Sequence, residues 1–421
     1  DANTTGDENT AVGTSAMGAN TTGGNNTAVG RSSLTANTTG GENTAVGFCS
    51  LYNNTTASHN TALGAYSLRD NTTGTTNTGI GRSALQNNST GNSNTAVGCQ
   101  ALKSNTTASN NTAVGCRALC ANTTGAENVA VGSLALDSNT TGDNNVAIGK
   151  QALASNTTGG SNIGIGRNAG ISITEGIRNI FVGHASGNTT STGDHNIGVG
   201  YHSLYSNTTA DSNTAVGFES SCKNTTGTSN SAFGEKASCL NTTGSANTSM
   251  GASALRSVTT GSDNTGVGLG AGLSLTTGSN NSFLGHDSGR STSPFEVTTE
   301  SNRIVLGDNS ITNAYIKVAL TVTSDLRDKT NFGEVPHGLD FVNKLKPVSF
   351  QFKKSREDDT PHGDVRYGFK AQDILELEGD NNVIIDDEQP DHLKYKGEHL
   401  VPILVNAIKD LKKEIDELKN K

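Results

Sequence analysis

A phrase of 17 residues, repeated in unbroken register from Asn3 to Leu275, constrains this chain more than any other feature of its sequence. When each unit is numbered from its first residue (Asn3, Asn20, Asn37 and so on), place 7 is always Asn and place 11 is always Gly. Place 10 is always apolar and place 14 is always Ala or Ser, whereas places 5, 6, 12, 13 and 16 vary. Self-similarity at a short fixed period is typical of solenoids and stacked arrays.

A unit this short and this rich in Gly, Asn and Thr has little helix propensity and no room for a helix pair. We therefore predict a mainly β fold, a β-solenoid whose rungs each hold two short extended segments and stack about 4.8 Å apart. Seventeen such rungs would form a rod roughly 80 Å long. In-register stacking places Asn above Asn and Thr above Thr, so that amides and hydroxyls form ladders along the axis. Gly at place 11 indicates a positive φ, or backbones too close together for a Cβ atom.

The composition excludes several classes of protein. A formal net charge of −9 on 421 residues gives no electrostatic footprint for nucleic acid. Aromatic residues make up only 4% and Trp is absent, which favours a slender core of Val, Leu, Ala and Gly. No apolar run reaches the length of a membrane span, and no spacing of ligands indicates a metal or cofactor. Asp1 and Ala2 occupy the last two places of a preceding unit, so we expect the array to begin upstream.

The Asn-Thr-Ala-Val-Gly segment is constant on both of its faces. Because side chains alternate along a strand, Thr and Val share one face while Asn, Ala and Gly share the other. A solitary solenoid in water needs constancy only on its inward face. We therefore expect the second face to pack against sister chains, as in a closed homotrimeric fibre.

Six Cys residues include two pairs that occupy the same place in adjacent units. Cys99 and Cys116 share place 12, and Cys222 and Cys239 share place 16. One-rung stacking would hold each pair near the Cα separation that a disulfide accepts. We favour the alternative, that they are small side chains at variable places and stay reduced in the cytoplasm during assembly.

The rhythm weakens in the middle of the array and ends before the C-terminus. Ile173 and Thr190 replace the Asn of place 1, and Phe181 replaces the Ala or Gly of place 9. Residues 291–296 are inserted material, residues 302–307 resemble a modified last rung, and residues 312–322 predict a β-rich neck.

At Ser324 charged residues become frequent and Gly becomes rare. We predict three segments: a repeat shaft (1–290), a modified last rung with a neck (291–323) and a small α+β domain (324–421). In the last segment we expect strands at 348–353 and 383–385 and a helix at 400–419. Apolar residues of the helix recur four and three apart, a heptad seam that suits either a coiled coil or packing on its own domain.

Identical rungs create a problem of alignment between chains. Chains that slip by one rung lose only one rung of contact, so slipped assemblies are deep traps, and such β pairings form slowly. A non-repetitive segment must therefore align the chains first, and the C-terminal domain is the candidate.

Four stretches of this domain occur in the order of a known family: 324–329 (SDLRDK), 345–350 (LKPVSF), 367–373 (YGFKAQD) and 400–409 (LVPILVNAIK). They resemble the intramolecular chaperone auto-processing domain that ends phage tail spikes, tail fibres, endosialidases and some large-virus fibres. The resemblance covers nearly all of residues 324–421. The repeats are loosely similar to the heads of trimeric autotransporter adhesins, with a longer unit.

The resemblance implies a trimerising chaperone that templates the fibre and is then cut off by a Ser–Lys dyad. Carried over to this sequence, Ser324 is the nucleophile, Lys329 is the base and Thr323–Ser324 is the scissile bond. A Ser hydroxyl needs such a neighbouring base to become nucleophilic. Residues five apart do not share a helical face, so the pair requires a loop or an adjacent subunit. The alternative is a solvated turn in which Asp325 and Asp328 keep the lysine charged.

We interpret the chain as a structural fibre of a virion, in the tail or on the capsid, assembled in the host cytoplasm. Its expected partners are two sister chains, other virion proteins upstream and a glycan or protein receptor on the host surface. Its enzymatic activity is at most a single-turnover self-cleavage. Place 12 of the rungs is expected to face outward; its larger residues include Arg31, Phe48, Arg82, Tyr201, Phe218 and His286.

Two other functions compete with this one. One is a glycan-binding or glycan-degrading tail spike; degradation would need paired carboxylates in a groove, and the array holds only scattered Asp and Glu. An ice-binding solenoid would use the Thr ladders, but Asn and Gly turns interrupt them and such a protein needs no chaperone domain.

Overall fold

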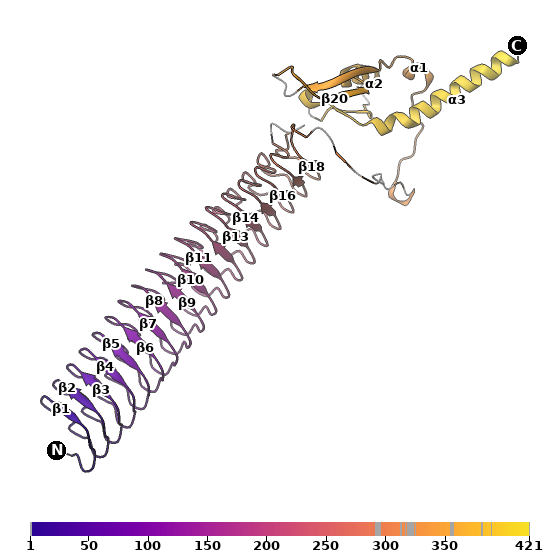
Figure 1. Ribbon diagram of the computed structural model, residues 1–421. Coiled ribbons are helices and arrows are strands. Elements are labelled where there is room, and N and C mark those ends of the chain that lie inside the picture. The colour runs from indigo at the N-terminus through magenta and orange to yellow at the C-terminus, as the bar shows by residue number, and fades with distance from the viewer. Residues whose placement is uncertain are drawn as a thin grey trace. The chain divides into compact units, whose positions relative to one another are not determined.

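The computed structural model describes residues 2–290, 296–311, 314, 315, 317, 324, 326–353, 358–379, 382–388 and 390–420. The described residues form two compact units (Figure 1), one made of residues 2–290 and 296–307 and the other of residues from 308 onward. The three segment boundaries expected from the sequence stay predictions.

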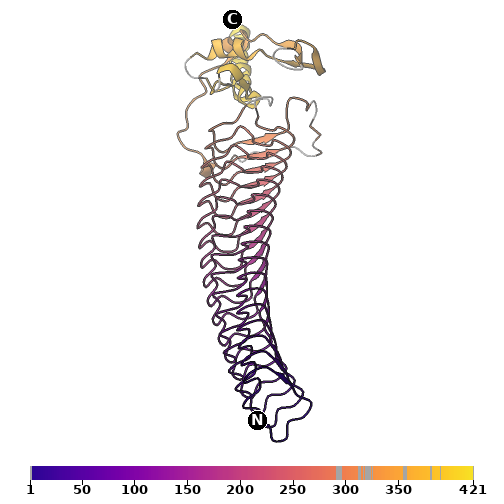
Figure 2. The same cartoon turned by 90° about the vertical axis from the view of Figure 1, so that its left-hand side faces the viewer.

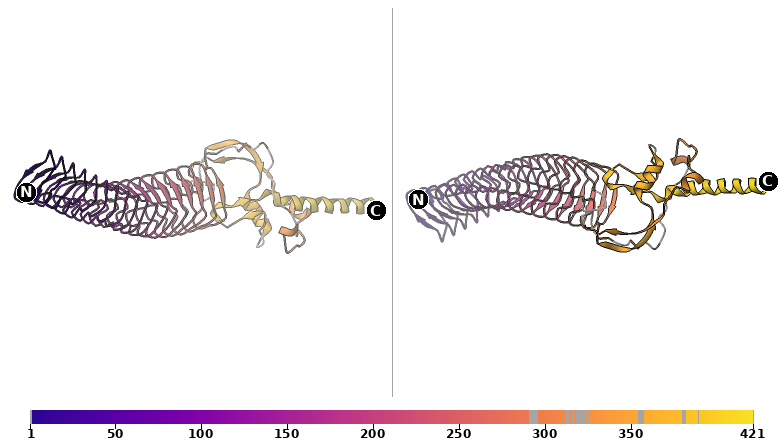
Figure 3. Two further views of the ribbon diagram at one scale, coloured as in Figure 1. Left: turned by 90° about the horizontal axis from the view of Figure 1, so that it is seen from below. Right: turned by 90° about the horizontal axis from the view of Figure 1, so that it is seen from above.

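The first unit is a β-solenoid, as the repeat predicts. Each rung contributes one three-residue strand at places 8–10, and each strand pairs in parallel with that of the next rung. Thr10, Ala11 and Val12, for example, lie opposite Thr27, Ala28 and Val29. Within the described residues this pairing gives an 18-stranded sheet, whose arrows form one column in Figure 2. The outline of successive rungs turns gradually along the stack (Figure 3).

The strands of this sheet are β1 Thr10–Val12, β2 Thr27–Val29, β3 Thr44–Val46, β4 Thr61–Leu63, β5 Thr78–Ile80, β6 Thr95–Val97, β7 Thr112–Val114, β8 Val129–Val131, β9 Val146–Ile148, β10 Ile163–Ile165, β11 Ile180–Val182, β12 Ile197–Val199, β13 Thr214–Val216, β14 Ser231–Phe233, β15 Thr248–Met250, β16 Thr265–Val267, β17 Ser282–Leu284 and β18 Ile304–Leu306.

The expectation of two extended segments in each rung is wrong in one respect. The remainder of the rung still bonds to the next rung, as in the Thr21 N–H that donates to the Thr38 carbonyl at 2.9 Å, but it forms no second strand in the described rungs. Non-glycine residues at places 6, 13 and 15, such as Asn25, Ser32 and Leu34, have φ values of 57°, 57° and 50°. These left-handed residues bend the chain and prevent a continuous extended run.

The core of each rung is slender and excludes the valine that we expected inside it. Ala28 at place 9, Ser33 at place 14 and Leu34 at place 15 are fully buried, and the same three places are buried in most other rungs. Side chains at places 8 and 10 point away from this core, because neighbours alternate along a strand. Val131 and Leu284 at place 10 are accordingly 36% and 56% exposed. The Asn and Ala face packs inside the solenoid, and the Thr and Val face is the outward one.

Glycine at place 11 satisfies both reasons that the sequence suggested. Gly30 has a φ of +134°, and a Cβ atom added to it would lie 2.6 Å from the carbonyl oxygen of Gly47 in the next rung. A side chain at this place would therefore strain the backbone and push adjacent rungs apart.

In the irregular rungs a large side chain at place 9 occupies the space that leucine at place 15 fills in most other rungs. Phe181 fills place 9 and is fully buried, while Gly170 and Gly187 stand at place 15, where most rungs have Leu. A Cβ added to Gly187 would lie 2.4 Å from the Phe181 ring. Phe283, with its own place-15 glycines, repeats this arrangement near the end of the array. One large side chain thus replaces two leucines.

The modified last rung is confirmed, since β18 pairs in parallel with β17 across the inserted segment. The expected β-rich neck lies mostly outside the described residues, and residues 314, 315 and 317 within it are not in a strand.

The second unit is a small α+β domain. Its elements are η1 Leu326–Asp328, α1 Leu339–Val342, β19 Val348–Lys353, β20 Pro361–Gly368, α2 Ala371–Glu378, β21 Ile385–Asp386, η2 Pro390–His392, β22 Lys394–Tyr395, η3 Gly397–His399 and α3 Leu400–Lys419. β19 pairs with β20 and β21 with β22, both antiparallel. The expected strand at 348–353 and helix at 400–419 are confirmed, whereas the strand at 383–385 begins only at Ile385.

The core of this domain joins α1, α2, β21 and the first turns of α3. It contains Phe341, Ile374, Ile384, Ile385, Leu400 and Ile403. In the described part of the chain, helices are too short or too polar to cross a membrane.

Candidate functional site

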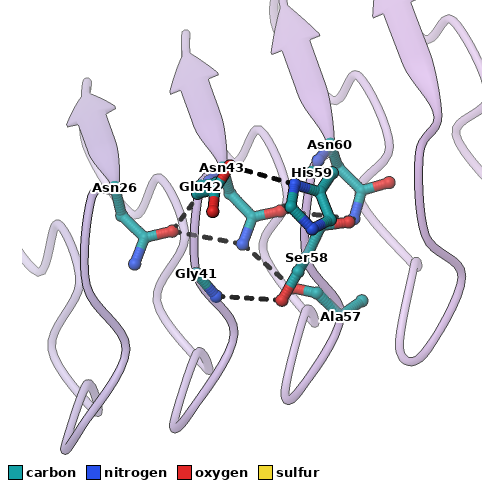
Figure 4. Close-up of polar contacts among 8 residues, drawn as sticks. All are labelled: Asn26, Gly41, Glu42, Asn43, Ala57, Ser58, His59 and Asn60. Carbon is teal, nitrogen blue, oxygen red and sulfur yellow. Dashed lines mark hydrogen bonds and ion pairs between the residues drawn. The ribbon is translucent and has the colours of Figure 1, made fainter.

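The shaft is held together by a ladder of buried amides at place 7 (Figure 4). The Asn43 backbone N–H donates to Asn26 Oδ1 at 2.9 Å, and the Asn43 side-chain amide donates to the Ala57 carbonyl in the next rung at 2.9 Å. Asn60 repeats the first of these bonds on Asn43 at 3.0 Å. Each amide thus satisfies two buried backbone groups of the next rung, one N–H and one carbonyl, a need that explains why place 7 accepts only Asn.

A second ladder runs along place 1. The Asn37 amide donates to Asn20 Oδ1 at 2.8 Å and to the Gly40 carbonyl at 2.9 Å. Where Ile173 interrupts this column, Asn156 Oδ1 is buried without a hydrogen-bond partner. The predicted Asn ladders are confirmed.

Threonine hydroxyls at place 2 also connect adjacent rungs, although they donate to a backbone carbonyl instead of to the next hydroxyl. Thr21 Oγ1 donates to the Thr38 carbonyl at 2.9 Å, and Thr38 Oγ1 donates to the Thr55 carbonyl at 3.1 Å. The hydroxyls are therefore occupied within the shaft.

Place 12 faces solvent, as expected. Tyr201 is exposed and stacks on His184 and Phe218, with ring centroids 5.4 and 5.3 Å apart. The other large residues named above for this place, Arg31, Phe48, Arg82 and His286, are exposed as well. Place 12 thus supplies much of the variable surface chemistry of the shaft, whereas places 7, 9 and 14 supply its packing.

The two residues expected to form the dyad lie in contact. Lys329 Nζ donates to Ser324 Oγ at 2.6 Å. The single turn of η1 between them reverses the chain, and the Lys329 backbone N–H closes that turn on the Leu326 carbonyl at 3.2 Å. A short 3₁₀ turn therefore joins residues that an α-helix would hold apart.

The surroundings of this pair are open to solvent in the single chain. Ser324 and Lys329 are both exposed, and Leu326 is 70% exposed beside them. Thr323, the other side of the expected scissile bond, lies outside the described residues, as do Asp325 and the side chain of Asp328. A hydrogen-bonded hydroxyl and amine can exchange a proton, which is the first step of nucleophilic attack by a serine.

Sequence reasoning missed a buried carboxylate that shapes the domain. Glu378 at the end of α2 is only 8% exposed. Its carboxylate accepts the backbone N–H groups of Val383, Ile384 and Ile385 at 2.7, 2.7 and 2.9 Å. These charge-assisted bonds fix the segment that leads into β21. Nothing in the sequence marks this Glu apart from the other acidic residues near it.

The heptad seam of α3 stays largely exposed in the described part of its domain. The first turns of the helix pack on that domain through Leu400, Ile403 and Ala407, which are 3–5% exposed. The seam lies elsewhere on the helix and is 43–70% exposed; its residues are Leu404, Ile408, Leu411, Ile415 and Leu418. Among the described residues, these side chains are therefore not buried by packing on their own domain.

The comparisons with known proteins concern this C-terminal region. A family model described as chaperone of endosialidase (Peptidase_S74) matches residues 324–384. The chain therefore carries a chaperone-of-endosialidase domain, and the matched segment begins at Ser324. It ends before α3, so the last stretch of the resemblance lies outside it. No curated protein and no solved structure matches the chain.

Proposed function

We propose that this chain forms the shaft of a viral fibre and assembles as a homotrimer. Its C-terminal domain aligns the three chains and is then released by self-cleavage before Ser324. One observation carries the proposal. An in-register solenoid, most of whose rungs repeat one pattern, is followed in the same chain by a chaperone-of-endosialidase domain.

The outward face of the sheet supports the homotrimer. Place 10 forms a continuous column of apolar side chains along all described rungs, and none of them is buried. Exposure reaches 46% at Leu63, 47% at Met250 and 66% at Leu306. A contiguous apolar stripe of this length is typical of an interaction surface. Sister chains fit it because every rung of the stripe then meets an equivalent rung.

The α3 seam supports the same assembly from the other unit. Its residues alternate four and three apart, the spacing of a coiled coil, and they lie exposed over most of the helix. Since this seam has an end and a unique sequence, pairing through it fixes which residue of one chain meets which residue of its neighbour. The rungs can then associate in register, without slipped intermediates.

The Ser324–Lys329 contact supports self-cleavage. Lys329 would take the Ser324 hydroxyl proton while Ser324 Oγ attacks the carbonyl carbon of Thr323. The peptide bond would break with its electron pair on the Ser324 nitrogen, which takes a proton, and an ester would form. Water would then hydrolyse the ester and leave a shaft ending at Thr323. Because a solvated amine is a poor base at neutral pH, we expect assembly to cover the pair before it reacts.

The test compares intact masses of the purified chain and of a Ser324→Ala variant. We expect a fragment ending at Thr323 from the former and the full chain from the latter. Ser310→Ala, in the exposed turn ahead of the site, is the matched control and should cleave normally. Full-length chain from all three proteins would refute self-cleavage and leave the aligning role standing.

The aligning role has its own test. A chain that lacks residues 324–421 should give misregistered aggregate, because nothing sets the starting point of the rungs. Sedimentation equilibrium and electron microscopy would measure the outcome. Soluble trimers of uniform length from this truncated chain would refute the role.

Viral origin and host attachment rest on the class of protein in which such domains are found. Binding of labelled fibres to intact host cells, competed by free shaft, is the corresponding measurement.

A further inference from the structure

The buried cysteines Cys222 and Cys239 form a close pair that the proposed function does not use. They occupy place 16 of adjacent rungs, and their Sγ atoms lie 2.6 Å apart. The two residues are 8% and 7% exposed. The two thiols therefore face each other directly in the interior of the shaft.

The backbone already has the geometry of a disulfide. Parallel in-register rungs hold equivalent Cα atoms about 4.8 Å apart, within the range that disulfides occupy. The Lys223 backbone N–H donates to the Cys239 carbonyl at 3.0 Å, which ties the two cysteine-bearing segments together. Neither backbone has to move for a bond to form between the sulfurs.

The environment also favours reaction of one of the two thiols. The hydrogen bond from the Cys222 thiol lowers the pKa of Cys239 to about 7, with Arg256 acting in the same direction. The same contact, and after it burial, raise the pKa of Cys222. Cys239 is therefore the sulfur that is present as thiolate, the reactive form, near neutral pH.

We propose that Cys222 and Cys239 form a disulfide that joins adjacent rungs of the shaft. This inference goes beyond the proposed function and does not depend on it.

The reaction requires an oxidant, for which we name a small disulfide such as oxidised glutathione. The Cys239 thiolate attacks one sulfur of the oxidant, forms a mixed disulfide and releases one glutathione thiolate, which takes up a proton. Cys222 then loses its proton and attacks Cys239 Sγ, which releases the second glutathione. Two electrons and two protons leave the protein, and one S–S bond remains in it.

Cys99 and Cys116 provide a matched control pair within the same chain. They are also one rung apart, at place 12, but both are exposed. They test whether one-rung spacing alone is sufficient for disulfide formation. If it were, both pairs of cysteines would form a disulfide to the same extent.

The experiment incubates the folded full chain with oxidised glutathione, blocks free thiols with iodoacetamide under denaturing conditions, and maps tryptic peptides. Trypsin cuts after Lys223 and Lys236, so the two cysteines fall in different peptides unless a disulfide links them. We expect the two peptides to be linked in most chains and to separate after reduction. In Cys222→Ser we expect Cys239 to carry one glutathione instead, because the mixed disulfide cannot resolve.

Alkylation of both Cys222 and Cys239 in the oxidised chain would overturn the proposal. So would a metal ion held between the two sulfurs, seen as extra mass in native spectra that a chelator removes. Circular dichroism of Cys222→Ser verifies that the variant is folded, so that an absent link is not mistaken for an unfolded shaft.

Discussion

The volume exchange around Phe181 leads to a quantitative prediction about the shaft. Phe181 is fully buried, and Gly170 and Gly187 beside it have no side chains that could move into the space it leaves. Phe181→Ala should therefore lower the free energy of unfolding by about 5 kcal/mol, the upper end of the usual range for such truncations.

Substitutions that compensate for the lost volume test the exchange between places 9 and 15 more sharply than the truncation does. The triple variant Phe181→Ala, Gly170→Leu, Gly187→Leu restores the residues that most other rungs carry at places 9 and 15. Leucine suits the backbone there, since Gly187 has a φ of +60° and Leu204, at place 15 of the next rung, has a φ of 49°. We expect the triple variant to recover all but about 1.5 kcal/mol of the loss, as volume-conserving changes do.

Gly187→Leu alone, with Phe181 retained, should instead overpack the rung and cost about 1–3 kcal/mol. The destabilisation is local in a solenoid, because each rung contacts only its neighbours. Hydrogen exchange of peptides around residues 170–204, together with thermal unfolding of the full chain, is the appropriate assay. If the triple variant were no more stable than Phe181→Ala, the exchange of volume between the two places would be refuted.

Three further predictions address the ladders, the small domain and the α3 seam. Asn128→Ala removes a place-7 amide and leaves the buried Asn145 N–H of the next rung without its acceptor, so it should cost about 1–3 kcal/mol, measured by local hydrogen exchange. Glu378→Gln places an amide donor among three backbone donors and should destabilise the C-terminal domain by about 2–4 kcal/mol in chemical denaturation, whereas exposed Glu376→Gln should change little. Leu411→Asp should abolish trimers in light scattering while Lys412→Asp preserves them, and equal effects of both would refute a role for the seam.

Much of the solenoid followed from the repeat itself. A period of 17 residues fixes the size of the rung, and Asn at place 7 of every rung and at place 1 of most rungs fixes the amide ladders, because stacked equivalent residues must meet. The helix at 400–419 was equally accessible, since its heptad pattern spans the whole element.

Other features were not accessible from the sequence. Places 13 and 15 have a left-handed backbone, yet they are occupied by residues such as Ser, Gln and Leu instead of Gly. The residue types therefore did not indicate the positive φ values. The closeness of Ser324 and Lys329 depends on one 3₁₀ turn, which spacing alone does not predict. The structural role of Glu378 depends on three backbone N–H groups of a later segment, which donate to its carboxylate only in the folded domain.

The sequence by itself determined that identical rungs stack in parallel and that a non-repetitive domain follows them. Tertiary structure decided which constant face points inward. Alternation shows that Ala and Val lie on opposite faces, but it does not show which of them lies inside. The closed rung leaves room for only a small side chain at place 9, beside the leucine of place 15. Alanine therefore fills the core, and the valine column remains on the surface.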